Sequence, residues 1–246
     1  MMTDINMYTT AGGRSQVGQT VLMVTVIDGG LDCVRVLAWE VVDVPRVTRE
    51  QKQRNRERIL AAAGEGFRLR GIDGTGIEGL MKSAGMTHGG FYNHFASKSD
   101  LAVEVLHQGF VDSLAVLDAV RAARPGSARA ALHSMVDQYL DAEHRDHPEV
   151  GCPSAALVSD AGRHGAAAQA EYRRGLDGYF SAIAEMVIEC GRESGTEIAP
   201  AEAREQAVAL FSQMVGALLL SRAIAGVAPD LSDEVLAANR NRLKDR

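Results

Sequence analysis

The stretch from Thr75 to Lys98 constrains the fold of this chain more than any other part of it. Four apolar residues recur there at spacings of three and four, which predicts a short helix with one apolar face. They are Ile77, Leu80, Met81 and Ala84. Gly85 follows them, and a glycine at that point can take the left-handed conformation that ends a helix. The pattern therefore predicts a short helix that stops at a tight turn.

A second short helix, from Thr87 to about Phe95, is predicted directly after this turn. Thr87 is suited to cap its N-terminus, and Phe91 and Phe95, four residues apart, mark its buried face. Ser97 is then placed to cap a third helix. Two short helices joined by a glycine-containing turn are typical of a helix-turn-helix, whose second helix enters the major groove of DNA.

At these residues the sequence resembles the TetR family of transcriptional regulators. The family's DNA-binding domain has a capped helix, an Ala-Gly turn, a recognition helix ending in an aromatic-Tyr-x-His-Phe segment, and a short loop with a lysine. Here these features are residues 84–85, 91–95 and 96–98, while residues 58–67 fit the family's first helix. The resemblance covers roughly residues 53–113, which is less than a third of the chain.

The resemblance implies an all-α fold. Residues 47–113 are expected to form an N-terminal three-helix helix-turn-helix DNA-binding domain of the TetR type. Residues 114–246 are expected to form a larger helical domain for effector binding and dimerisation. Residues 1–46 are an atypical N-terminal extension whose runs at 21–26 and 34–44 are rich in β-branched residues and would suit strands. We expect this extension to be poorly ordered.

The charges are distributed unevenly along the chain. The whole chain has a formal net charge of −6, whereas residues 46–98 hold ten Lys or Arg against five Asp or Glu. That segment therefore carries +5 and the remainder carries −11. A basic segment on an acidic body suits a protein that binds DNA at one place, because contacts with phosphates supply much of the affinity. A solvated helix face with a chance excess of charge is the alternative.

Nine residues make up the predicted DNA-binding set. They are Thr75, Thr87, His88, Gly89, Gly90, Tyr92, Asn93, His94 and Lys98. Thr87 and His88 lie at the leading end of the second helix and are the candidates for contacts with base edges. The resemblance implies that Tyr92, His94 and Lys98 contact phosphates, which fixes the register on DNA without reading its sequence.

Gly89 and Gly90 depart from the family's pattern. Two glycines cost a helix about 1.5–2 kcal/mol relative to alanines. One interpretation is that the missing side chains let the backbone approach the groove closely. The other is a weakly helical turn held by Phe91 and Phe95, which would suit a helical interaction module with a decayed DNA-binding helix.

The stretch from Asp141 to Pro153 is a second place where chemistry could occur. Pro153 suits the first position of a helix, so Cys152 would lie at its N-cap, where the helix dipole favours a thiolate. The resemblance implies that Cys152 is a candidate sensor of electrophiles or oxidants, and a small residue in a tight corner is the alternative. His144 and His147 lie among acidic residues, yet charged loop residues are the commoner explanation. We predict no metal site and no cofactor.

The remaining sequence predicts amphipathic helices without an internal repeat. After Pro200, residues 207–224 are apolar around most of the circumference, so this helix should be buried on more than one side. The resemblance implies that the two terminal helices pair with those of a second copy. It also implies that the central helices surround a small-molecule effector, whereas an aromatic stripe such as that at 172–187 is more often plain core. No apolar run reaches the length of a membrane span, and three widely spaced cysteines suit a reducing cytosol.

We therefore predict a cytoplasmic, homodimeric, DNA-binding transcriptional regulator. The resemblance favours a repressor that an unidentified small-molecule effector releases from a double-stranded operator with two half-sites. Two alternatives remain, a regulator that senses electrophiles or oxidants through Cys152 and the decayed interaction module. An enzyme is not predicted, because the sequence has no G-x-S-x-G elbow, HExxH motif or phosphate-binding loop.

Overall fold

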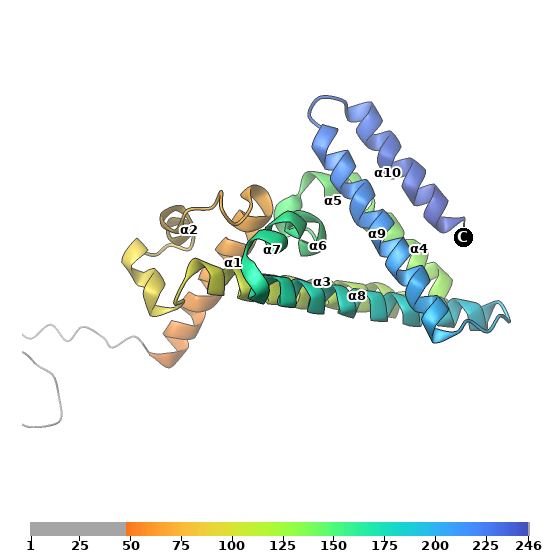
Figure 1. Ribbon diagram of the computed structural model, residues 1–246, viewed down its shortest axis with the longest axis horizontal. Helices are drawn as coiled ribbons and strands as arrows, with labels where there is room; N and C mark the ends of the chain where they lie inside the picture. Colours follow the sequence, from red (N-terminus) through yellow and green to blue (C-terminus); the bar gives the residue numbers. More distant parts are fainter. Residues whose placement is uncertain (1–47, 246) are drawn as a thin grey trace, which may run out of the picture. The chain divides into compact units, whose positions relative to one another are not determined.

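The computed structural model describes residues 48–245 (Figure 1). Every regular element in this part of the chain is a helix, which confirms the predicted all-α fold class. The predictions for residues 1–46 lie outside the described residues. The described residues form one compact unit, and α3 (Lys98–Ala122) runs through position 113. The division into two domains at that position therefore stays a prediction.

The first two helices of the helix-turn-helix region lie where the sequence predicts them. α1 (Arg49–Arg70) begins after Thr48, whose hydroxyl accepts a hydrogen bond from the Gln51 N–H at 3.1 Å. α2 (Ile77–Ser83) follows a short turn. Gly85 then has a φ of 69°, and the N–H of Met86 donates to the Met81 carbonyl, which closes the end of α2.

The predicted recognition helix differs in kind from the expectation. Instead of an α-helix from Thr87 to about Phe95, the chain forms a 3-10 helix, η1 (His88–Asn93). Two glycines in a row disfavour a regular α-helical turn, and Phe91 and Phe95 hold the segment from below. The third helix, α3, begins as predicted after Ser97, which accepts a hydrogen bond from the Asp100 N–H at 3.0 Å.

The body is built around three long helices, α3, α8 and α9, with shorter helices between and after them. α3 packs lengthwise against α8, and α9 packs against both α8 and α10 (Figure 1). Of the short elements between α4 and α8, η2 and α6 pack against α1. The body elements are α4 (Ala128–Tyr139), α5 (Ala142–Asp146), η2 (Pro148–Val150), α6 (Pro153–Ala156), α7 (Val158–Arg163), α8 (Gly165–Glu193), α9 (Pro200–Ile224) and α10 (Pro229–Lys244).

α9 is long and apolar enough to cross a membrane by length and composition alone. Its contacts indicate a core helix instead. Phe211, Met214 and Leu218 on one face are buried by 99% or more, and α8 and α10 cover them. The sequence predicts burial on more than one side of this helix, whereas 39% of its most apolar 18 residues are buried in the structure. Outward-facing Leu220 stays 64% exposed.

Candidate nucleic-acid interface

The inner face of η1 is anchored in the hydrophobic core. Phe91 is fully buried and Phe95 is 3% exposed, and their rings stack with centroids 5.8 Å apart. Met81 of α2 belongs to the same buried cluster. The two phenylalanines therefore fix which side of η1 faces the protein, and the opposite side is presented to solvent.

The outer face of η1 carries polar side chains that no part of the described chain covers. Thr87, His88 and Asn93 are exposed, and Tyr92 is 62% exposed. The Tyr92 and Phe91 rings meet edge to face, with their centroids 5.2 Å apart. A Cβ atom added to Gly89 would meet nothing within 4 Å. This face is therefore free for a large partner, and at Gly89 the partner can approach the backbone itself.

His94 joins η1 to the first helix. The Arg56 guanidinium donates to the His94 carbonyl, lies 4.2 Å above the Phe95 ring, and pairs with Glu104 of α3. Burial lowers the pKa of the His94 imidazole, and the cations of Lys52 and Arg56 lower it further. Arg56 thus acts as an internal clamp. Sequence reasoning missed this role, because it counted Arg56 only among the basic residues of the first helix.

Two predicted DNA-contact residues make contacts inside the protein. Thr75 is 2% exposed, and its hydroxyl lies 2.9 Å from the carbonyl oxygens of both Gly66 and Gly71. Although Thr75 lies just before α2, it does not cap this helix, because Gly76 is the N-cap residue. Since the Thr75 hydroxyl is used inside the turn, we leave it out of the proposed interface. Lys98 is half-buried, and its Nζ lies 3.5 Å from the Asp73 carbonyl oxygen.

The first half of α1 adds positive charge to this region. Four of its basic side chains are exposed to solvent. They are Arg49, Lys52, Arg54 and Arg58. Within the described chain, only Arg54 of these four lies near a carboxylate, that of Glu50 at 3.9 Å, which is a weak contact. Such side chains are suited to bind phosphates, because they can replace the counterions of a nucleic acid.

Cys152 lies in the body, far along the chain from η1. It is the N-cap residue of α6 as predicted, but it is only 6% exposed and its Sγ lies 3.4 Å from the Tyr179 hydroxyl. A buried cysteine among aromatic rings behaves as a small apolar residue, because reagents reach it poorly. His144 accepts a hydrogen bond from the Cys152 N–H at 3.2 Å, which orders the corner before α6.

His144 should make stability depend on pH. Its Nδ1 donates to the Tyr139 carbonyl at 2.8 Å while its Nε2 accepts from Cys152, so the neutral ring is the form that fits. Burial lowers the pKa of His144, and the Arg222 cation lowers it further. The unfolded chain therefore binds the proton first, and the free energy of unfolding should fall as the pH drops from about 6.5 through the folded pKa.

Urea unfolding between about pH 5 and 8 measures this effect. The His144→Gln variant keeps an amide that can accept from Cys152 but does not titrate. We expect the variant to lose part of the acid-induced decrease in stability that the wild-type protein shows. Parallel pH curves for the two proteins would contradict the assignment.

His147, by contrast, is exposed and lies beside Glu149, so the two histidines do not converge.

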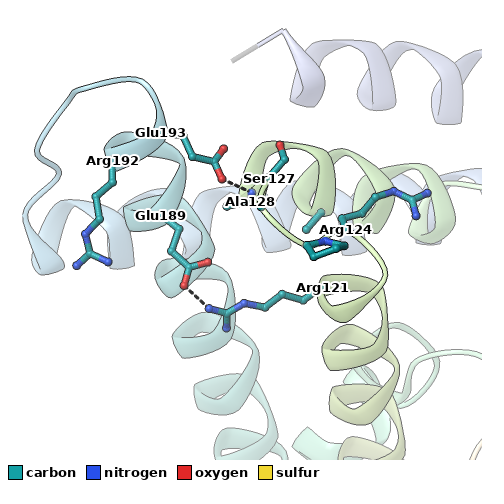
Figure 2. Close-up of a pocket in the computed structure, with 10 residues that line it drawn as sticks. Arg121, Arg124, Ser127, Ala128, Glu189, Arg192 and Glu193 are labelled. Carbon is teal, nitrogen blue, oxygen red and sulfur yellow. Dashed lines mark hydrogen bonds and ion pairs between the residues drawn. The ribbon is translucent and has the colours of Figure 1, made fainter.

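A cleft of about 440 Å³ lies at the far end of the body, between the end of α3, the start of α4 and the end of α8. Figure 2 shows two contacts across the cleft. Glu193 accepts a hydrogen bond from the Ala128 N–H, and Arg121 pairs with Glu189. These contacts hold α8 against α3 and α4, so we interpret this cleft as a structural feature rather than a binding site.

The geometry defines a class of protein: a helix-turn-helix with an exposed polar recognition face, joined to a helical body. Residues 59–105 match the model of a family described as bacterial regulatory proteins, tetR family. This match agrees with the resemblance to the TetR family that the sequence shows. Among curated relatives, an uncharacterized HTH-type transcriptional regulator, YfiR of Bacillus subtilis, is 29% identical over 97 residues. The HTH-type transcriptional regulator AcrR of Shigella flexneri is 38% identical over 60 residues.

These alignments cover 39% and 24% of this chain and only 46% and 28% of the two relatives. The chain thus matches less than half the length of these curated relatives. Solved structures extend the likeness to the whole fold. The reduced form of NemR from E. coli has a TM-score of 0.66 at 24% identity, covering 78% of this chain and 95% of that one. A TetR transcriptional regulator from Legionella pneumophila has a TM-score of 0.65 at 19% identity, covering 77% and 95%.

Proposed function

We propose that the chain is a cytoplasmic transcriptional regulator that binds double-stranded DNA through η1 and the first half of α1. The observation that carries this proposal is the outer face of η1, which is polar, exposed and held rigidly by Phe91 and Phe95 from below. In this interface Thr87 and His88 contact base edges, while Tyr92, Asn93, His94 and Lys98 contact the backbone. Gly89 and Gly90 allow close approach. The relatives, which are transcriptional regulators, support the same assignment.

The regulator acts as a homodimer on two half-sites, because one short recognition element contacts too few base pairs for specific binding. The α9–α10 pair supplies the surface for a second copy. Leu220, Val227 and Leu231 of this region are 64%, 86% and 50% exposed, which is unusual for large apolar side chains. A two-fold axis through α9 and α10 would repeat the recognition face on both half-sites.

An effector in the body completes the proposal, and the protein acts as a repressor that the effector releases. The support is a cluster of aromatic and polar groups between α4, α6, α8 and α9. Tyr179 stacks on Phe211 at 4.4 Å, and the Tyr172 hydroxyl donates to the Ser154 carbonyl at 2.7 Å. Within the described residues, the fully buried Ser154 Oγ has no hydrogen-bond partner. A buried polar atom of this kind suits a small polar ligand.

Binding to the duplex DNA next to the protein's own gene tests the proposal. We expect tight binding that weakens by about 10³-fold or more between 50 and 200 mM salt, because both half-sites exchange counterions for basic side chains. Tyr92→Phe should weaken binding about tenfold, since it removes a hydroxyl that bonds to a charged phosphate. Its ring keeps the contact with Phe91, so the fold should be unchanged.

The alternatives make different predictions in the same titration. No binding at either salt concentration would indicate an interaction module with a decayed recognition element. Binding that Tyr92→Phe leaves unchanged would remove Tyr92 from the interface. Because the Cys152 thiol is buried, the wild-type protein should bind as tightly as a Cys152→Ala variant both before and after treatment with an alkylating reagent. Loss of binding by the wild-type protein alone after alkylation would favour the cysteine sensor.

A further inference from the structure

Two hydrogen bonds, each between a side chain and a backbone group, join the helix-turn-helix region to the short elements of the body. The Arg68 guanidinium at the end of α1 donates to the Glu149 carbonyl of η2 at 3.1 Å. The Asp160 carboxylate of α7 accepts a hydrogen bond from the Ile72 N–H at 2.8 Å. Ile72 lies in the turn between α1 and α2. The second bond therefore attaches the body to the segment that leads directly into α2 and η1.

The turn is shaped for this close approach. Gly71 has a φ of 74°, and a Cβ atom at that position would lie 3.2 Å from the Asp160 carboxylate. The His164 imidazole closes the other side, with its Nε2 3.5 Å from the Asp73 carboxylate and 3.9 Å from that of Asp160. The side chains of Asp160 and His164 are each only 15% exposed. The contact is therefore largely shielded from water, which strengthens a hydrogen bond to a charged acceptor.

We propose that Asp160 is a positioning residue that couples the body to the recognition element. Because it holds the Ile72 N–H, it fixes the start of α2, and α2 packs on η1. A change in the body that moves α7 must then move η1 relative to its operator. Since such coupling is reciprocal, DNA bound at η1 must also change the stability of α7. This inference rests on the proposed function, but the tie between Asp160 and Ile72 can be tested without DNA.

Amide hydrogen exchange on the full-length protein tests the tie directly. In Asp160→Ala, exchange at Ile72 and in the first turn of α2 should be about tenfold faster or more, because the N–H loses a charged acceptor. Arg68 still holds α1, so the variant should fold. Asp160→Asn should keep exchange close to the wild-type rate, because its amide oxygen can accept the same hydrogen bond. Unchanged exchange at Ile72 in Asp160→Ala overturns the proposal.

Glu193→Ala is the matched control. It also removes a carboxylate that accepts a backbone N–H at a junction between elements, but at the far end of the body (Figure 2). The wild-type protein and Glu193→Ala should bind duplex DNA from the region of the protein's own gene with the same affinity. Asp160→Ala should bind about tenfold more weakly, within the usual range of coupling between sites. DNA should slow exchange in α7 of the wild-type protein and not in Asp160→Ala.

The outcomes separate the coupling from the function. If the wild-type protein does not bind the duplex, the proposed function is overturned, and the coupling to operator binding with it. If the wild-type protein binds and Asp160→Ala matches it, both in affinity and in the slowing of exchange in α7, only the coupling is overturned. Recovery of affinity in Asp160→Asn confirms that the hydrogen bond, rather than the charge, positions the turn.

Discussion

Replacing Phe91 by alanine is expected to lower the free energy of unfolding by about 3–5 kcal/mol and to abolish DNA binding. Phe91 is fully buried, stacks on Phe95 and supports the Tyr92 ring. The cavity would lie directly under the polar face of η1. With two glycines next to it, this short 3-10 helix has little intrinsic stability, so it depends on the Phe91 ring for its shape. Urea unfolding and DNA titration measure the two effects.

Tyr92→Ala provides the contrast to Phe91→Ala. Tyr92 is its neighbour in the chain but is 62% exposed, and substitutions at exposed positions usually change stability by about 0.5 kcal/mol or less. Tyr92→Ala should therefore weaken DNA binding while the unfolding curve barely moves. If Phe91→Ala unfolds earlier but binds DNA with wild-type affinity at low temperature, the recognition face does not depend on this anchor.

Gly175→Ala should destabilise the body by about 1–3 kcal/mol or more, although alanine is the better helix former. An added Cβ would lie 2.1 Å from Cγ of Phe110, which is 3% exposed. The Phe110 ring cannot move aside easily, because Tyr172 and Tyr179 contact it with centroids 5.5 and 6.3 Å away. The clash must push α3 and α8 apart. Because α3 begins next to η1, DNA affinity should fall as well.

Gly178→Ala is the matched control on the same helix. Its added Cβ would meet Cδ1 of Leu114 at 2.8 Å, and that atom is the far end of a flexible, half-buried side chain. Leu114 can change rotamer, so this variant should lose much less stability than Gly175→Ala. Thermal unfolding of the two variants side by side gives the comparison. A destabilisation of equal size in both would mean that the approach of α3 and α8 tolerates an extra methyl group.

Short-range patterns predicted most of the helices correctly. Ser97 caps α3 with the side-chain hydrogen bond that its position predicts, and Thr48 and Ser127 cap α1 and α4 in the same way. These signals act between residues three or four apart, so they can be recognised without any knowledge of packing. The conformation of Gly85 is of the same kind, because only a residue that tolerates positive φ can close that turn.

The candidate site was predicted less completely. Thr87, His88 and Tyr92 are exposed, as expected from a buried face formed by Phe91 and Phe95. Thr75, in contrast, is buried in the turn. A threonine after two glycines has the pattern of a helix cap, and nothing local indicates that its hydroxyl faces back to Gly66. For η1, the sequence left two interpretations open, a regular helix and a weakly helical turn, and the structure has a 3-10 helix. The phenylalanine spacing of four fits an α-helix, while the glycine pair weakens it.

The sequence by itself determined the class of fold, the order of the helices and the resemblance to a known family over residues 59–105. All three depend on spacings, caps and a motif that lie within a few residues of each other. Only the tertiary structure decided that Arg56 clamps His94 and Glu104, that Gly175 meets Phe110, and that Asp160 holds Ile72. The members of these contacts are 38 to 88 residues apart in the chain. No local propensity links such residues, because only the packing of whole helices brings them together.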